Sequence, residues 1–139
     1  MNIIELVKSI VESYEEIGKL HIDYTGAVPD SCGISSTGDV LQTEDILGNK
    51  TRQHNFVLYT VWQSQSDYDR MVNSGILLGL QCYLEQAVQG QTVTSPDGKN
   101  GELTKITCSN GMLYSVPNGN LNAGVIYQLQ ISAQYVIYK

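Results

Sequence analysis

The stretch KTRQHNFVLYTVWQ, residues 50–63, decides the fold class of this chain. Its second half carries apolar or aromatic side chains on both alternating faces, a pattern typical of a central strand that is covered on both sides. Its first half is polar around Arg52, Gln53 and His54, so we expect that end to project into solvent or into a partner. A sheet therefore forms the centre of the predicted fold, with this strand inside it.

Two helices are expected beside the sheet. Residues 2–17 repeat apolar side chains at three- and four-residue steps, which predicts an amphipathic helix with Asn2 as its N-cap and Gly18 as its stop. A second helix is predicted over residues 66–88. Gly75 lies inside it and costs about 1 kcal/mol relative to alanine, so we expect a kink or a short break there, where another backbone approaches closely.

The segments after the second helix read mainly as strands. Residues 89–101 have the composition of a mobile loop. Asn110-Gly111 is predicted as a two-residue hairpin turn, because both positions tolerate a positive φ. Three strands are expected around this turn and at the end of the chain: residues 103–108, 112–116 and 124–138.

The secondary structure of residues 21–47 is predicted less definitely. Residues 21–24 are a short strand candidate, whereas residues 34–47 are ambiguous between a strand pair and an irregular, loop-like excursion. The length suits one domain over residues 1–139. The element order predicts an α+β fold, a mainly antiparallel sheet with two helices packed on one face.

Charge and composition exclude several classes of protein. The chain has 139 residues, a formal net charge of −6 and 42% hydrophobic residues, which is ordinary for a globular protein. Residues 1–50 hold nine acids against three lysines, so the acidic field belongs to this part. An acidic balance argues against a sequence-independent nucleic-acid binder. No stretch is long and apolar enough to cross a membrane.

Motifs that carry chemistry are sparse. The three cysteines have no Cys-x-x-Cys spacing and predict free thiols in a reducing compartment. Asp39 follows a glycine-rich stretch where a phosphate loop needs lysine, and its charge would repel phosphate. His21 and His54 are too few for a histidine-rich metal site. We therefore predict no catalytic residue, no metal and no cofactor.

Tyrosine is unusually frequent among the aromatic residues. The chain has nine tyrosines against one tryptophan and one phenylalanine. Tyrosine buries area while keeping a polar tip and is enriched at protein interfaces. Tyr114 and Tyr127, in the late strands, are therefore interface candidates.

A series of short motifs runs through nearly the whole chain: MNIIE at 1–5, IDY at 22–24, RQ at 52–53, FVLYTVW at 56–62, NSGIL at 73–77, YLE at 83–85, YQLQ at 127–130 and YVIY at 135–138. In their order and spacing these motifs resemble the small tail-terminator proteins, also called minor capsid proteins, of tailed phages and prophages of Gram-positive bacteria. Residues 34–47 and 89–101 depart from the pattern.

The resemblance implies a non-enzymatic structural protein of the virion with an α+β fold, assembled in the host cytoplasm and located at the tail or neck. Such proteins form a ring, usually hexameric, that caps the tail tube, ends its polymerisation and joins it to the head connector. The implied partners are other copies of the chain, the tail tube protein and the head–tail connector protein. DNA would pass through the lumen without specific binding.

Within this frame, Asp39, Glu44 and Asp45 are hypothesised to face the lumen or the tube. Arg52 and Gln53 are further interface candidates, because arginine pairs bidentately with a neighbour's carboxylate. Two alternatives stay open. One is another neck component, such as a stopper or an adaptor. The other is a small α+β enzyme or ligand-binding domain, which a deep polar pocket with converging Asp, His or Cys side chains would favour.

Overall fold

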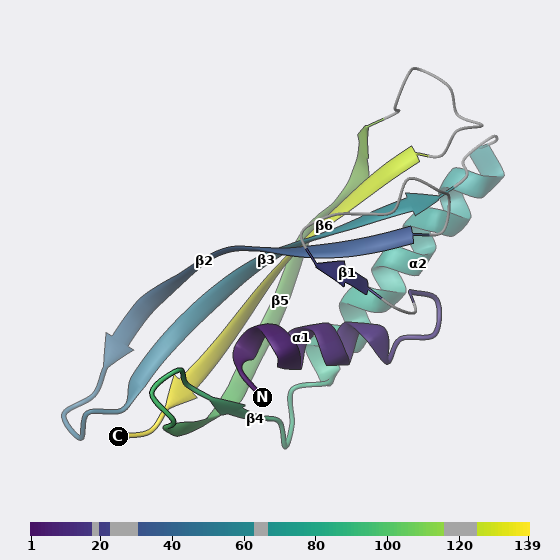
Figure 1. The fold of residues 1–139 in the computed structure, drawn as a ribbon. Coiled ribbons are helices and arrows are strands. Elements are labelled where there is room, and N and C mark those ends of the chain that lie inside the picture. The colour runs from purple at the N-terminus through teal and green to yellow at the C-terminus, as the bar shows by residue number, and fades with distance from the viewer. Residues whose placement is uncertain (18–19, 23–30, 63–66, 116–124) are drawn as a thin grey trace.

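The computed structural model describes residues 1–17, 20–22, 31–62, 67–115 and 125–139 (Figure 1). Its elements follow one another as α1 (Ile3–Glu12), β1 (Leu20–Ile22), β2 (Ser31–Glu44), β3 (Lys50–Trp62), α2 (Asp67–Gln86), β4 (Thr92–Thr94), β5 (Asn100–Ser115) and β6 (Val125–Ile137). Of the predicted features, Gly18, Asp23, Tyr24 and Ser66 lie outside the described residues.

The strands form one sheet in the order β1-β2-β3-β6-β5-β4. All neighbouring pairs are antiparallel except β1 and β2, which are parallel. β3 pairs with β2 on one edge and with β6 on the other, from Lys50 opposite Ile137 to Trp62 opposite Val125. The prediction of a central strand over this stretch is confirmed.

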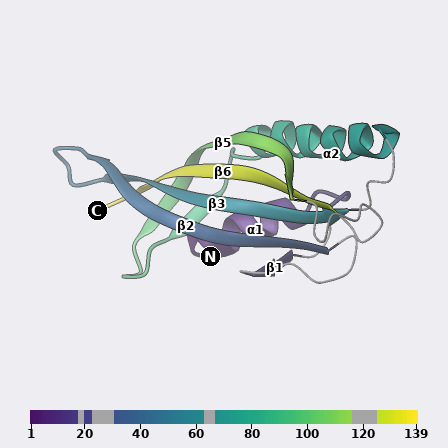
Figure 2. The same cartoon turned by 90° about the horizontal axis from the view of Figure 1, so that it is seen from above.

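Both helices pack on one face of the sheet, as predicted. In β6 every second residue from Val125 to Ile137 is buried, and the residues between them are not. The buried set joins apolar side chains of α1 and α2 in one core. Figure 2 shows α2 running beside β5. The α+β fold class is therefore confirmed.

The second face of β3 is less covered than predicted. Val57 and Tyr59 are half-buried, and in the described part of the chain neither helix lies over them. The expectation of a strand covered on both sides is wrong there. β-branched and aromatic side chains are stabilised on a half-exposed sheet by their cross-strand neighbours, so their presence does not require a second covering layer.

α1 begins where predicted and ends early. The Asn2 side chain accepts a hydrogen bond from the Glu5 amide at 2.9 Å, and the Glu5 side chain accepts one from the Asn2 amide, which completes a capping box. The helix ends at Glu12, although Ile17 is still buried. The Ser13 hydroxyl donates to the Ile10 carbonyl at 2.5 Å, a local bond that competes with helix continuation.

α2 is one continuous helix of 20 residues, so the expected break at Gly75 is wrong. Gly75 lies on the exposed side, and a methyl group placed there would meet nothing within 4 Å. The close approach occurs one turn later at Gly79, where a methyl group would collide with the Tyr14 hydroxyl. The Tyr14 and Tyr83 rings pack at 5.3 Å between centroids, which fixes α2 against the turn after α1.

Two segments that were not predicted as single strands belong to strands. Residues 34–47, left open between a strand pair and an irregular excursion, are mostly β2, one strand of 14 residues. Residues 89–101 contain β4 and the start of β5, joined by a turn in which Ser95 and Lys99 are hydrogen-bonded. Polar composition does not distinguish a loop from a strand here, because edge strands and the ends of hairpins are also exposed to solvent and can carry polar residues.

The predicted hairpin at Asn110-Gly111 is also wrong. The two strands predicted around it are one strand, β5, which continues along β6. The pairing shifts register between Ser109 and Met112, so Asn110-Gly111 lies in a β-bulge and not at a turn. Gly111 does not have the positive φ that the predicted two-residue turn would need, so the chain continues as a strand through this position.

Neither described helix has the length and apolar character of a membrane span. None of the three cysteines is part of a disulfide: Cys32 is buried, Cys108 is half-buried and Cys82 is exposed. Burial, with the nearby charge of Glu85, raises the pKa of Cys108 to about 12.

Candidate functional site

The end of the β2–β3 hairpin is the first part of the candidate site. β1 pairs with β2 only as far as Ile34, so residues 39–54, which we call the distal hairpin, extend beyond it (Figure 1). Residues 40–47 are all exposed. At the turn, Ile46 is 101% exposed and Leu47 is 69% exposed. The hairpin thus presents two large apolar side chains at its outermost point.

Asp45 holds this turn in shape. Its Oδ1 accepts hydrogen bonds from the amides of Leu47 and Asn49, each at 2.9 Å, and its Oδ2 accepts one from the Asn49 side chain at 3.2 Å. The bond from the Asn49 amide is the main reason that the pKa of Asp45 lies below its ordinary value. Gly48 supplies the positive φ of +88° that closes the turn. The apolar tip is therefore a fixed feature.

A bulge in β2 decides which face Asp39 occupies. Ser36 is opposite Phe56, yet Gly38 is opposite Asn55, so Thr37 is an extra residue in β2. Regular alternation would place Ser36 and Asp39 on opposite faces. With the extra residue, both lie on the helix side of the sheet, beside His54. Gly38 has a φ of +150°, which other residues rarely adopt, and so makes this bulge possible.

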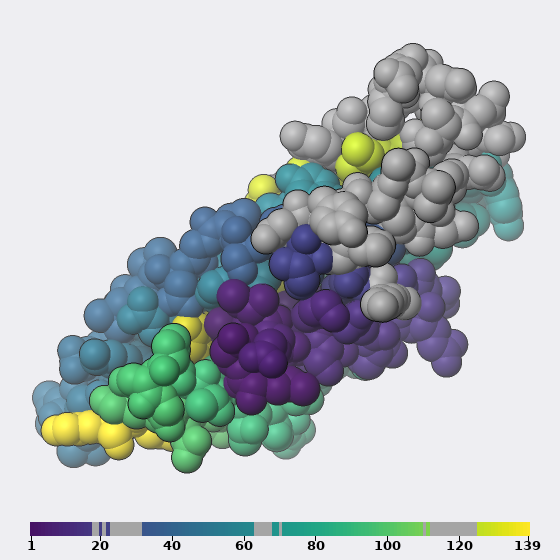
Figure 3. Space-filling view, viewed as in Figure 1, coloured from purple at the N-terminus to yellow at the C-terminus, as the bar shows by residue number. Residues whose placement is uncertain are grey.

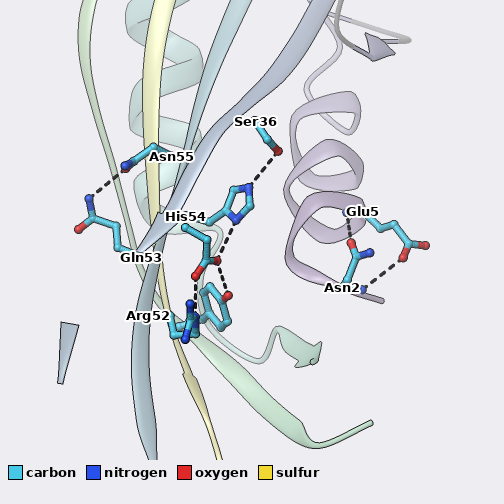
Figure 4. A network of polar contacts seen from close by, with 9 residues as sticks. Asn2, Glu5, Ser36, Arg52, Gln53, His54 and Asn55 are labelled. Carbon is cyan, nitrogen blue, oxygen red and sulfur yellow. Dashed lines mark hydrogen bonds and ion pairs between the residues drawn. The ribbon is translucent and has the colours of Figure 1, made fainter. Parts of the chain in front are cut away.

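Asp39 is the centre of a polar cluster, which we call the Asp39 cluster. Figure 4 labels three of its members, Ser36, Arg52 and His54. Its Oδ1 accepts a hydrogen bond from Arg52 Nε at 2.5 Å. Its Oδ2 accepts one from the Tyr135 hydroxyl at 2.5 Å and one from His54 Nδ1 at 2.9 Å. His54 Nε2 lies 2.9 Å from Ser36 Oγ. These five residues come from β2, β3 and β6 and tie the three strands together.

The electrostatics of the cluster favour an ionised Asp39. Burial raises the pKa of Asp39, but the hydrogen bonds from Tyr135, His54 and Arg52 outweigh it and hold that pKa below its ordinary value. The hydrogen bond to Asp39 raises the pKa of the Arg52 guanidinium. Burial, together with the bond to Asp39, also raises the pKa of Tyr135. The cluster therefore contains a stable carboxylate–guanidinium pair.

A groove of about 530 Å³ adjoins the cluster. It lies between the distal hairpin, the start of α1 and the β4–β5 turn, on the face seen in Figure 3. Asp39, Arg52, His54 and Tyr135 line it together with apolar side chains such as Ile4. Within the described residues, no three His, Cys, Asp or Glu side chains lie close enough together to hold a metal ion.

The structure brings some of the predicted interface residues together and separates others. Asp39 and Arg52 bind each other within one chain. Glu44 and Asp45 stay exposed at the end of the hairpin. Gln53 lies on the opposite face of β3, where its amide donates to Asn55 at 3.0 Å. The interface hypothesis for these residues stays a prediction.

The two tyrosine candidates fare differently. Tyr127 is only 1% exposed, and its ring packs 5.6 Å from that of Trp62, so its place on an interface is wrong. Alternation along β6 puts residue 127 on the helix face, in the core. Tyr114 belongs to β5, but its side chain lies outside the described residues.

Sequence reasoning missed Ser36, His54 and Tyr135 as members of one cluster. Arg52 and His54 share a face of β3 by simple alternation, and this signal was available. The bulge at Thr37-Gly38 was not visible, because its location depends on how β2 pairs with β3.

The chain was also compared with known proteins. No protein-family model matches it, and no curated protein matches it. A solved structure described as the virion of a native gene transfer agent particle contains a chain with 10% sequence identity and a TM-score of 0.46, covering 96% of this chain and 85% of that one. A likeness at this level carries no argument about fold or function.

Proposed function

We propose that this protein is a structural component of a phage virion. It forms a hexameric ring on the end of the tail tube. The ring ends tube polymerisation and joins the tail to the head connector. Its partners are further copies of this chain, the tail tube protein and the connector protein, and it assembles in the host cytoplasm. This role is not enzymatic and needs no cofactor.

The observation that carries the proposal is the distal hairpin with its apolar tip. Ile46 and Leu47 are exposed in a turn that Asp45 holds in shape. A fixed, exposed apolar side chain at the end of a projecting hairpin is suited to enter a protein surface. Together with the motif series that resembles tail terminators, it supports a protein whose task is contact with other proteins.

The charge of the chain is consistent with a DNA conduit. The net charge is −6, and Glu44 and Asp45 are exposed on the distal hairpin. Carboxylates on the wall of a lumen would repel passing phosphates and let DNA move without being gripped. We therefore propose that Glu44 and Asp45 face the lumen and not the tube, whereas Asp39 serves the interior of its own chain.

Tail assembly in the presence and absence of the protein tests the proposal. Tubes assembled from the tail tube protein of the same virion should have a uniform length, in negative-stain images, only when this chain is present. Purified chain should bind the ends of preformed tubes. Binding to the isolated connector but not to tubes would indicate a stopper or an adaptor. Tubes of unregulated length in the presence of the protein would refute the terminator role.

A second candidate function has one specific observation in its favour. Ser36 Oγ, His54 and Asp39 are connected in the order of a Ser–His–Asp catalytic triad, with both links at 2.9 Å. The bonds that Arg52 and Tyr135 make to Asp39 stabilise the same carboxylate and weaken its effect on His54, so we favour a structural role for the cluster.

An active-site probe separates the two functions. A fluorophosphonate should not label the wild-type chain if the cluster is structural. Labelling of the wild-type chain that is lost in the Ser36→Ala variant would establish a hydrolase site and refute a purely structural role of the cluster.

A further inference from the structure

The exposed large apolar side chains gather in two places. Among the described residues there are eleven of them, and eight lie either on the distal hairpin or on α2. We call the first group the tip patch; it consists of Val40, Leu41, Ile46 and Leu47. We call the second group the helix patch; it consists of Tyr68, Met71, Val72 and Leu78. Scattered surface leucines need no explanation, but two concentrations on one small chain do.

The helix patch is a continuous stripe along α2. Tyr68, Met71 and Leu78 form a line at steps of three and four residues together with Gly75 and the exposed Cys82, and Val72 lies beside this line, four residues from Tyr68. The opposite side of α2 carries Leu77, Leu80 and Leu84 into the core. α2 is thus apolar on two sides, of which only one is used within the described part of the chain. Gly75 has open space above it and leaves a shallow place in the middle of the stripe.

The two patches lie at opposite ends of the molecule (Figures 1 and 2). They therefore cannot meet within one chain. When the tip of one copy meets the helix of another, each pair still has one free tip and one free helix patch. Such a head-to-tail contact repeats until the assembly closes into a ring or grows into a filament.

We propose that the tip patch of one copy docks on the helix patch of the next copy, with Leu47 seated over Gly75 and Ile46 beside Leu78 and Cys82. This inference rests on the proposed ring and identifies the surfaces that build it. Pairing of two tips is disfavoured, because each tip carries Glu44 and Asp45 and the like charges would face each other.

The size of the contact fits assembly on a template. A stable interface buries about 800 Å² on each partner, whereas a hairpin tip offers only a few side chains. One tip-to-helix contact is therefore weak. Several contacts around a closed ring, held together on a tube end, reinforce one another through their high effective concentration. Free chains are then expected to be mostly monomeric, with rings accumulating on tubes.

Cysteine cross-linking tests the docking on the full-length chain. The Ile46→Cys variant places a thiol at the tip, and the native Cys82 supplies an exposed thiol at the end of the helix patch. Cys32 is buried and the raised pKa of Cys108 leaves it unreactive near pH 8. Mild oxidation, with chain alone at high concentration and with tube ends present, is followed on non-reducing gels. Lys105→Cys, an exposed position on β5 away from both patches, is the matched control.

The expected result is a ladder of covalent oligomers that ends at the ring number, disappears when Cys82→Ser is added and is absent for Lys105→Cys. Dimers that survive Cys82→Ser would show tip-to-tip pairing, and wild-type dimers through Cys82 would show helix-to-helix pairing; either overturns the proposal. A link between the tip and the tube protein would also overturn it. If tube length is still controlled while no Cys82-dependent link forms, the docking is wrong and the terminator function stands.

Substitution gives an independent measure. Ile46→Ser and Leu78→Ser each remove an exposed apolar side chain, so the urea midpoint of the free chain should stay unchanged. Burial of such a side chain corresponds to a roughly 10- to 100-fold change in affinity, so each variant should need that much more protein to form rings. Ring formation at the wild-type concentration in both variants would overturn the docking.

Discussion

Replacing Asp39 with asparagine tests whether the Asp39 cluster stabilises the fold. The substitution keeps the size of the side chain but removes its charge and turns one acceptor oxygen into a donor. Tyr135 and His54 both donate to the same oxygen, Oδ2, and both residues are buried. The amide can keep its oxygen toward these two donors, but its NH2 group then faces the Arg52 Nε–H, so one of the three donors loses its acceptor whichever way the amide is oriented.

The expected loss follows from the exposure of each partner. A hydrogen bond to a charged acceptor contributes about 1 kcal/mol more than a bond to a neutral one, so the two buried donors lose about 2 kcal/mol together when the acceptor becomes neutral. The half-exposed Arg52 pair adds about 0–1 kcal/mol, so we expect Asp39→Asn to lower the free energy of unfolding by about 2–3 kcal/mol at pH 7. The Arg52 side chain is 35% exposed and stays hydrated without its partner, which keeps its share small.

Urea unfolding at pH 7 measures this loss. Glu15→Gln is the matched control, because it removes one exposed acid for which no partner is found among the described residues, and it should change the stability by less than about 0.5 kcal/mol. A loss of less than about 0.5 kcal/mol in Asp39→Asn would refute the stabilising role of the cluster.

The pH dependence supplies a second check. The pKa of Asp39 is lower in the folded chain than in the unfolded chain, so its contribution is present above the unfolded value, about 3.9, and is lost as the pH falls through the folded value. The difference between wild type and variant should therefore be constant from pH 7 to pH 5 and shrink below about pH 4. A difference that stays the same down to pH 2 would contradict the argument.

Three further substitutions have definite expected outcomes in the same unfolding assay. Thr60→Val should stabilise by about 1 kcal/mol, because the buried Thr60 hydroxyl has no hydrogen-bond partner in the described structure; a loss of stability would contradict this. Gly75→Ala should stabilise by about 0.5–1 kcal/mol through helix propensity, whereas Gly79→Ala should gain clearly less because its methyl group meets the Tyr14 hydroxyl; equal gains would count against that packing. Gly101→Ala should destabilise by about 2 kcal/mol or more, since its methyl group would collide with a backbone carbonyl of β6, and a neutral result would show that the strands separate easily there.

The parts of the fold that the sequence predicted well are those in which a single pattern agrees with the packing. β3 and β6 combine long alternation with β-branched and aromatic residues, and both are found nearly as predicted. α1 has a capping box and one apolar stripe. In each case the local preference and the buried face point to the same structure.

The errors about β2, β4 and β5 share one physical cause. β2, β4 and the bulge in β5 are polar segments with glycines, and they are strands only because a neighbouring strand pairs with them. Gly38, Gly98 and Gly111 look like turn residues in the sequence, but only Gly98 lies in a turn between strands. Strand pairing is a non-local property, and composition alone does not contain it.

The sequence identified two residues of the candidate site but not the interactions that they make. Asp39 was selected to face the lumen or the tube and Arg52 to pair with a neighbour's carboxylate, whereas the two residues bind each other. Their meeting depends on one extra residue in β2, which turns Asp39 toward the helices. A regular β2 would have left Asp39 on the open face of the sheet, away from His54 and Tyr135.

The cluster and the tip are mechanically connected, and this links stability to assembly. Asp39 and Arg52 join β2 to β3 within the distal hairpin, and Tyr135 joins that hairpin to β6. A hairpin fixed at its base presents Ile46 and Leu47 in one direction, and a contact formed by a fixed element loses less conformational entropy on binding than one formed by a loose element. Asp39→Asn should therefore weaken tip-to-helix docking although no atom of Asp39 touches the partner. Ile46→Ser should weaken docking without any change in stability. The two variants therefore distinguish the effect of the hairpin's orientation from the effect of the contact that its tip makes.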